Sequence, residues 1–120
     1  MENKRLCESD LRFLGVIWDN EPLGSMKLVE LCAEKLGWKK STTFTMLRKL
    51  GEKGLVRNEN SVVTSRVSRG EVQAAESEMF VEQTFAGSLP QFLVSFLGGK
   101  TISGEEAAEL KRLIDAHQED

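Results

Sequence analysis

The stretch STTFTMLRKLGEKGLVRNENSVVTSRV, residues 41–67, decides the fold, because a helical pattern gives way within it to two β-prone runs. Three apolar side chains recur at the spacing of one helix face: Met46, Leu47 and Leu50. Gly54 suits the left-handed position that follows a helix. Residues 55–58 and 62–67 are β-prone and residues 59–61 can turn, which predicts a small hairpin after the helix.

Two amphipathic helices are predicted before this segment. Ser9 and Asp10 are capping-type residues that begin the first helix, which ends near residues 19–20. Its apolar residues are Leu11, Phe13, Leu14, Ile17 and Trp18. Pro22 and Gly24 then break the chain before the second helix.

The second helix can be capped by Ser25 and ended by Gly37. Its apolar face consists of Leu28, Leu31, Cys32 and Leu36. A short link leads to Ser41, where the third helix starts. Three helices followed by a two-stranded hairpin are the element order of a winged helix-turn-helix. We therefore expect residues 1–68 to form a winged-helix DNA-binding domain within a mainly α protein.

Three more helices are predicted in residues 69–120. Ser68 with Glu71, and Ser103 with Glu106, have capping-box spacing, and Ser88 can cap the helix between them. The fourth helix ends near residues 86–87. Helical spacing on the last two helices predicts apolar faces of Leu89, Phe92, Leu93, Phe96 and Leu97, and of Ala107, Leu110, Leu113 and Ile114.

Such short helices are marginally stable alone in water, so their apolar faces must be buried somewhere. They either pack back on the first domain or against a second copy of the chain. The long fourth helix and the acidity of this half favour a homodimer, and we expect residues 69–120 to be a helical dimerisation domain. The predicted interface residues are Leu89, Phe92, Leu93, Phe96, Leu97, Leu110, Leu113 and Ile114.

Length and composition exclude several classes of protein. The chain has 120 residues, of which 29% are charged and 40% hydrophobic, as in one ordinary globular domain or a small domain with an oligomerisation element. No run approaches the roughly 18 apolar residues of a membrane helix, and residues 1–10 lack an apolar signal core. The two cysteines, Cys7 and Cys32, form no metal or disulfide framework. We expect a cytoplasmic protein without membrane insertion.

The net charge of −3 conceals a division between the two halves of the chain. Residues 1–70 carry 13 basic and 9 acidic residues, a net of +4, whereas residues 71–120 carry 3 and 10, a net of −7. Because the Debye length is only about 8 Å in physiological salt, a distant acidic segment cancels little of a basic face. The basic residues either bind an anionic partner or merely solvate helix surfaces.

The third helix is predicted to enter the DNA major groove. Hydroxyl side chains near its N-terminus can meet base edges while lysine and arginine reach phosphates. The side chains expected to contact DNA are Lys39, Lys40, Ser41, Thr42, Phe44, Thr45, Arg48 and Lys49, with Arg57 and Arg66 of the hairpin. The alternative is that residues 41–43 are only a capping segment. DNA binding should weaken steeply as salt rises, whereas a winged-helix protein-interaction adaptor would bind no duplex.

An enzyme is not expected, and no cofactor or metal is predicted. The only histidine, His117, lies near the C-terminus, where the helix dipole favours it. The sequence contains neither a glycine-rich phosphate loop nor metal-ligand spacing.

Several stretches, in this order and spacing, match a known family. They are Ser9-Asp10-Leu11 through Val16-Ile17-Trp18, Gly37-Trp38, residues 42–50, Glu52-Lys53-Gly54-Leu55-Val56, Phe85-Ala86-Gly87-Ser88, Phe92-Leu93-Val94-Ser95-Phe96 and residues 105–114. Together they resemble the BlaI/MecI/CopY penicillinase-repressor family along nearly the whole chain. The resemblance implies a dimeric transcriptional repressor that binds inverted-repeat operators of a TACA/TGTA kind.

The resemblance places the positions of Ser41, Thr42, Phe44 and Thr45 against the bases. Family members often have a basic residue where this chain has Ser41 and Phe44. Because phenylalanine cannot make the bidentate guanine contact of arginine, the resemblance does not predict the operator of this chain.

The β-lactam branch of the family is released by proteolytic cleavage at an Asn-Phe bond in the fifth helix. The matching bond here is Ser95-Phe96, and the implied partner is a membrane sensor-protease. A cut there would split the dimer face and lower DNA affinity, because both half-sites must be held together. The copper-sensing branch has a C-terminal cysteine cluster; this chain has no cysteine after Cys32, so thiolate-based copper release is not expected.

Overall fold

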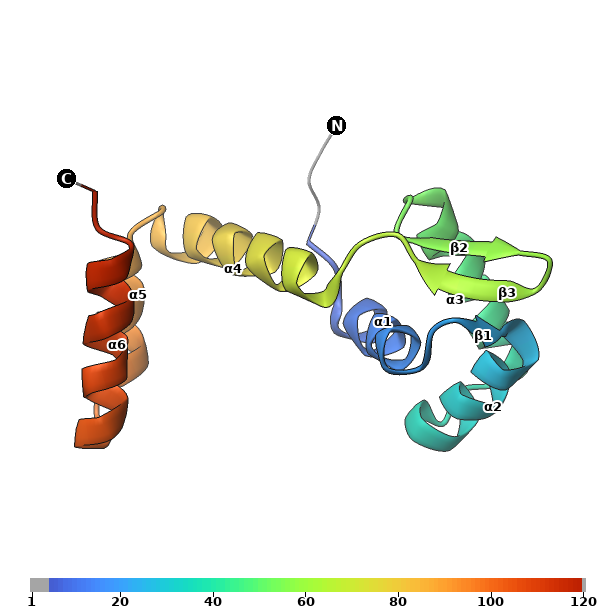
Figure 1. Ribbon diagram of the computed structural model, residues 1–120, viewed down its shortest axis with the longest axis horizontal. Helices are drawn as coiled ribbons and strands as arrows, with labels where there is room; N and C mark the ends of the chain where they lie inside the picture. Colours follow the sequence, from blue (N-terminus) through green and yellow to red (C-terminus); the bar gives the residue numbers. More distant parts are fainter. Residues whose placement is uncertain (1–4, 120) are drawn as a thin grey trace. The chain divides into compact units, whose positions relative to one another are not determined.

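The computed structural model describes residues 5–119 and divides the chain into two compact units, Met1–Phe80 and Val81–Asp120. We call residues 5–80 the head and residues 81–119 the C-terminal unit. The head contains three helices and a small sheet, followed by the first part of a fourth helix (Figure 1). Its elements are α1 (Glu8–Asn20), β1 (Leu23–Gly24), α2 (Ser25–Leu36), α3 (Lys40–Glu52), β2 (Val56–Glu59) and β3 (Val62–Ser65). The prediction of a mainly α protein with an N-terminal winged helix is confirmed.

The sheet has three antiparallel strands in the order β1-β3-β2, one more than the predicted hairpin. The additional strand, β1, pairs Leu23 with Val63 and Gly24 with Val62. Two residues are too few to show a strand periodicity, so the sequence pattern did not reveal it. The Ser25 N–H donates to the Ser61 carbonyl at 2.8 Å, which fastens the start of α2 to the hairpin.

The hairpin turn is tighter than predicted, because Glu59 belongs to β2 and pairs with Val62. Only Asn60 and Ser61 remain in the loop, with φ of 53° and 63°. A two-residue loop with positive φ at both positions matches the right-handed twist of the strands it joins.

One apolar core lies between the three helices and the sheet. Most residues of the predicted faces of α1, α2 and α3 are buried, whereas Leu11, Trp18 and Leu36 are half-buried. The buried core includes Phe13, Leu14, Ile17, Leu28, Leu31, Cys32, Met46, Leu47 and Leu50 of the helices, with Val56 and Val63 of the sheet. The Trp38 ring stacks on Phe13 with centroids 5.7 Å apart, which packs the link between α2 and α3 onto α1. The core thus holds α3 by one face and leaves its other face in solvent.

The helix starts differ from the predicted caps by one or two residues. α1 is capped at Cys7, whose N–H donates to Asp10 Oδ2 at 3.2 Å. α2 begins at Ser25 after Gly24, and α3 begins at Lys40 after Lys39. The predicted left-handed conformation of Gly54 is confirmed by its φ of 80°, and Gly37, predicted only to end α2, is also left-handed with a φ of 71°.

The fourth helix, α4 (Arg69–Phe85), crosses the boundary between the two units. Its predicted capping box is present: the Ser68 N–H donates to Glu71 Oε1 at 2.8 Å, and the Glu71 N–H donates to Ser68 Oγ at 3.0 Å. The first compact unit includes residues 69–80, because side chains of this part of α4 contact α1 and the residues before it. The functional division at residues 68/69 stays a prediction.

The C-terminal unit contains the end of α4 with α5 (Leu89–Leu97) and α6 (Gly104–Ala116). The predicted caps hold, because Ser88 Oγ accepts from the Gln91 N–H at 3.1 Å and Ser103 Oγ from the Glu106 N–H at 3.0 Å. Among the described residues, none of α5 or α6 is buried. None of the helices formed by residues 5–119 combines the length and apolar character that crossing a membrane requires.

Candidate nucleic-acid interface

The outer face of α3 carries hydroxyl and basic side chains. Thr43, Met46, Leu47 and Leu50 are buried, so the side chains between them point into solvent. The exposed positions are Lys40, Ser41, Thr42, Thr45, Arg48, Lys49, Gly51 and Glu52. Lys40 lies in the first turn, three hydroxyls follow in the first half of the helix, and Arg48 and Lys49 lie in the second half. Hydroxyl side chains can meet base edges, and cations can reach phosphates.

The N-terminus of α3 is positively charged. The capping residue, Lys39, is followed by Lys40, and the first turn contains no acidic residue. Thr43 turns inward, and its hydroxyl donates to the Lys39 carbonyl at 3.2 Å. The two lysines add to the positive end of the helix dipole, which favours a phosphate at this end.

Phe44 lies differently from the other predicted contacts. Its ring is half-buried against the core and forms one wall of an open hollow of about 430 Å³ between α3 and β2. The hollow is lined by Phe44, Leu47, Arg48, Gly51, Val56 and Asn58. Part of this side chain is covered by the protein, which limits the contact it can offer to a base.

Asn58 is a candidate contact that was missing from the predicted set. It lies two residues after buried Val56 on β2, so both side chains are on the strand face turned toward α3. Exposed Asn58 and Arg48 line the same hollow, so an amide and a guanidinium lie on the same side of the head. The alternation in residues 56–58 was the available signal.

Lys49 is drawn toward the core by a buried carboxylate. Asp10 of α1 is 2% exposed, and its Oδ1 lies 3.5 Å from Lys49 Nζ. No hydrogen-bond donor within the described residues reaches that oxygen. Burial raises the pKa of Asp10, but hydrogen bonds from Cys7 and the positive charges of Lys49 and Lys53 outweigh it and leave the pKa lowered. Lys49 therefore joins α3 to α1.

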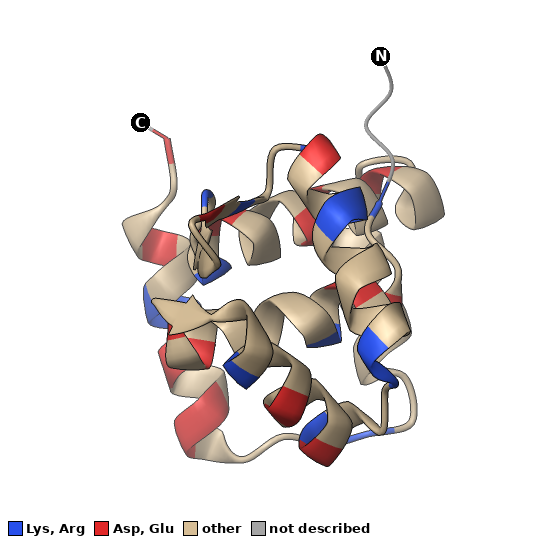
Figure 2. Ribbon diagram, turned by 90° about the vertical axis from the view of Figure 1, so that its right-hand side faces the viewer, with Lys and Arg blue, Asp and Glu red and all other residues tan. Residues whose placement is uncertain are grey.

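The two predicted wing arginines are both exposed. The Arg57 guanidinium lies 3.8 Å from Glu59 on the same strand, and an exposed pair of this kind contributes little and separates readily. Arg66 follows β3, and its N–H donates to the Leu55 carbonyl at 2.8 Å. Figure 2 shows lysines and arginines on several elements, interspersed with acidic residues; the basic character of α3 is therefore local.

Comparison with known proteins identifies the family of the chain. The model of a family described as Penicillinase repressor matches residues 6–116 of the chain. The penicillinase repressor of Bacillus licheniformis is similar to it, with 23% identity over 118 residues that cover 95% of this chain and 92% of the relative. The family consists of transcriptional repressors and not of enzymes. With a match over nearly its whole length, the chain belongs to the penicillinase repressor family.

Proposed function

We propose that the protein represses transcription as a homodimer that binds an inverted-repeat DNA operator through α3. The observation that carries the proposal is the outer face of α3, where the exposed hydroxyls of residues 41, 42 and 45 lie between the cations Lys40 and Arg48, opposite a buried inner face. The proposed base contacts are Ser41, Thr42, Phe44 and Thr45. The proposed backbone contacts are Lys39, Lys40, Arg48, Asn58, Arg57 and Arg66.

The C-terminal unit supports the homodimer part of the proposal. Phe96 is 53% and Ile114 57% exposed, and Leu89, Leu110 and Leu113 are exposed as well. Phe92, Leu93 and Leu97 are half-buried between them. A second copy of the chain can cover these side chains in an isologous interface. A two-fold dimer places its reading helices in successive major grooves, about 34 Å apart.

The DNA part of the proposal is tested by duplex binding as a function of salt. Arg48→Ala should weaken binding to an inverted-repeat duplex, and Lys35→Ala, which removes an exposed cation from α2, is the matched control. Affinity of the unchanged protein should fall steeply as salt rises. If no duplex binds even at low salt, the chain is an interaction adaptor and the proposal is wrong.

The homodimer is tested by sedimentation of the full chain. The unchanged protein should sediment as a dimer and Phe96→Asp as a monomer, because a carboxylate cannot be buried in the apolar interface. Val94→Asp on the same helix, the most exposed large apolar residue of α5, tests whether the effect is specific to the predicted face. A monomeric unchanged protein at high concentration would rule the dimer out.

We also propose, from the family resemblance, that a membrane sensor-protease releases the repressor by cutting the Ser95-Phe96 bond. Both residues are exposed near the end of α5. A protease needs extended backbone, and a nine-residue helix with no buried residue opens at low cost. The test is incubation with membranes that contain the candidate protease, followed by mass measurement of the fragments. An intact chain, or a cut at another bond, would contradict the proposed cleavage.

A further inference from the structure

One face of α4 carries the residues that join this helix to the rest of the head. Arg69, Val72, Glu76 and Phe80 are spaced by three, four and four residues and so lie in one row. Val72 is the buried residue of α4, and Glu76 and Phe80 are half-buried. At about 1.5 Å per residue, the row extends over about 16 Å of the helix.

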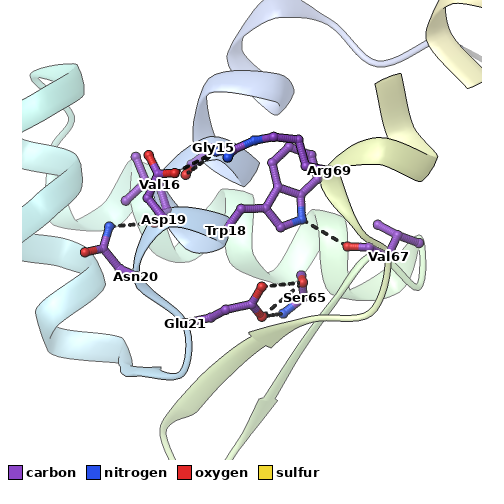
Figure 3. A network of polar contacts seen from close by, with 9 residues as sticks. All are labelled: Gly15, Val16, Trp18, Asp19, Asn20, Glu21, Ser65, Val67 and Arg69. Atoms are coloured by element: carbon purple, nitrogen blue, oxygen red, sulfur yellow. Dashed lines mark hydrogen bonds and ion pairs between the residues drawn. The ribbon is translucent and has the colours of Figure 1, made fainter. Parts of the chain in front are cut away.

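The first attachment lies at the start of the row (Figure 3). Arg69 Nη2 donates to Asp19 Oδ1 at 2.8 Å, and the guanidinium lies 5.2 Å from the Trp18 ring centroid. Trp18 Nε1 donates in turn to the Val67 carbonyl at 3.0 Å, just before α4 begins. The end of α1 thus holds the first residue of α4 from two sides.

The link that enters α4 is held by a separate set of hydrogen bonds. The Glu21 carboxylate accepts from the Ser65 N–H at 2.7 Å, and both of its oxygens accept from the Ser65 hydroxyl, at 3.0 and 2.9 Å (Figure 3). With β3 fixed at its last residue, only residues 66–68 separate the sheet from α4. The point at which α4 starts is therefore determined by the head.

The second attachment lies two turns further along α4. Glu76 Oε2 accepts from the Leu6 N–H at 3.1 Å, and Oε1 accepts from Arg5 Nε at 3.4 Å. The Arg5 guanidinium lies 5.4 Å from the Phe80 ring centroid. The Glu76 side chain is 14% exposed and the Arg5 side chain 39% exposed, so the carboxylate is largely covered while the guanidinium still reaches solvent. Two attachments on one helix fix its direction, whereas one would leave it free to pivot.

We propose that Glu76 is a positioning residue, which with Arg5 and the Leu6 N–H fixes the direction of α4 on the head and so makes the dimer selective for half-site separation. The inference rests on the proposed function. In a dimer joined through the C-terminal units, each α4 leads from one head toward the interface. A fixed α4 lets both heads bind DNA together only at a matching separation, and other separations forfeit the gain of about 100-fold or more that simultaneous binding supplies.

The experiment measures affinity of the full chain for two half-sites whose separation is changed one base pair at a time, each step turning one site by about 35° relative to the other. The affinity of the unchanged protein should be highest at one half-site separation and fall sharply on either side of it. Glu76→Gln and, independently, Arg5→Ala should flatten the profile and leave affinity for a single half-site unchanged. Ser77→Ala, at an exposed neighbouring position of α4, should keep the sharp optimum.

The outcomes separate the inference from the proposed function. A sharp optimum that Glu76→Gln and Arg5→Ala both retain overturns the inference and leaves the repressor model intact. A flat profile for the unchanged protein also overturns it. Failure of the unchanged protein to bind any inverted repeat overturns the proposed function itself. Thermal melting of each variant shows whether the head is folded, and equal half-site affinity confirms that its reading face is preserved.

Discussion

At the scale of single residues, the buried carboxylate of Asp10 separates two of the predicted DNA contacts, Lys49 and Arg48. Its position at the N-terminus of a helix predicted a capping role, and it does accept the Cys7 N–H. Its second oxygen attracts Lys49, a contact between residues 39 positions apart that no local pattern contains. Lys49 therefore differs from its neighbour Arg48, which is exposed beside an open hollow.

The difference between Arg48 and Lys49 predicts separable effects of their replacement. Arg48→Ala should weaken DNA binding and reduce the slope of log affinity against log salt by about 1, because one phosphate contact is lost. Lys49→Ala should leave that slope unchanged and lower the melting temperature, because Asp10 loses its cation. Titrations at several salt concentrations and thermal melts distinguish the two. Equal slope changes would return Lys49 to the DNA-contacting group.

Asp10 also predicts how stability responds to acid. Its pKa is lowered in the folded state, so the folded protein binds the proton less readily than the unfolded chain. The contribution of Asp10 to stability is complete above the ordinary value of 3.8 and is lost as pH falls through the lowered folded pKa. Asp10→Asn should therefore destabilise the protein by about 1–3 kcal/mol at neutral pH and less in acid.

The measurement is urea unfolding of the full chain at a series of pH values. Asp115→Asn, which removes a carboxylate from exposed α6, is the control. The free energies of unfolding of the unchanged protein and of Asp10→Asn should converge as pH falls below about 4. A constant difference at every pH would show that Asp10 stabilises the head without its charge.

At the scale of secondary-structure elements, periodicity and capping patterns predicted all six helices and the hairpin. The apolar spacing of residues 46–50 and the glycines at 37 and 54 were sufficient for α3, because these signals are local. β1 was missed because two residues carry no period. Asn58 and the Glu76–Arg5 contact were missed for a related reason: each depends on which elements meet in space. The exact helix starts also differed, because Lys39 and Gly24, not hydroxyls, precede α3 and α2.

The hairpin turn predicts a stabilising substitution. Ser61 has a φ of 63°, which costs about 1 kcal/mol for a residue with a β-carbon. Ser61→Gly should recover about 0.5–1 kcal/mol of unfolding free energy and give the Asn-Gly pair that such turns favour. Thermal melting checks this, with Ser77→Gly in exposed α4 as an opposite control that should destabilise by about 0.5 kcal/mol. A lower melting temperature for Ser61→Gly would contradict the turn geometry.

At the scale of the whole molecule, the two units differ in how their apolar side chains are covered. The head buries its own core, whereas α5 and α6 bury none of their residues among those described. In the C-terminal unit the rings of Phe85, Phe92 and Phe96 contact one another at 5.7 and 5.8 Å between centroids, and Phe96 still remains exposed. We therefore expect the two units to respond differently to protein concentration.

This difference predicts a concentration-dependent melting transition. Anything that binds only the folded form raises its melting temperature, so a dimer interface should make the C-terminal transition move upward as protein concentration rises. The head transition should stay constant. Calorimetry over a wide range of concentrations checks both. A C-terminal transition that is independent of concentration would mean that the apolar side chains of α5 and α6 need no second copy.

The uncovered C-terminal unit has a further consequence for the cell. If only paired chains hold both operator halves, the amount of working repressor grows roughly with the square of the number of newly made chains at low abundance. When synthesis is halved, the amount of dimer then falls by more than half. Transcription from a promoter that this dimer represses would therefore respond steeply to small changes in the amount of protein made.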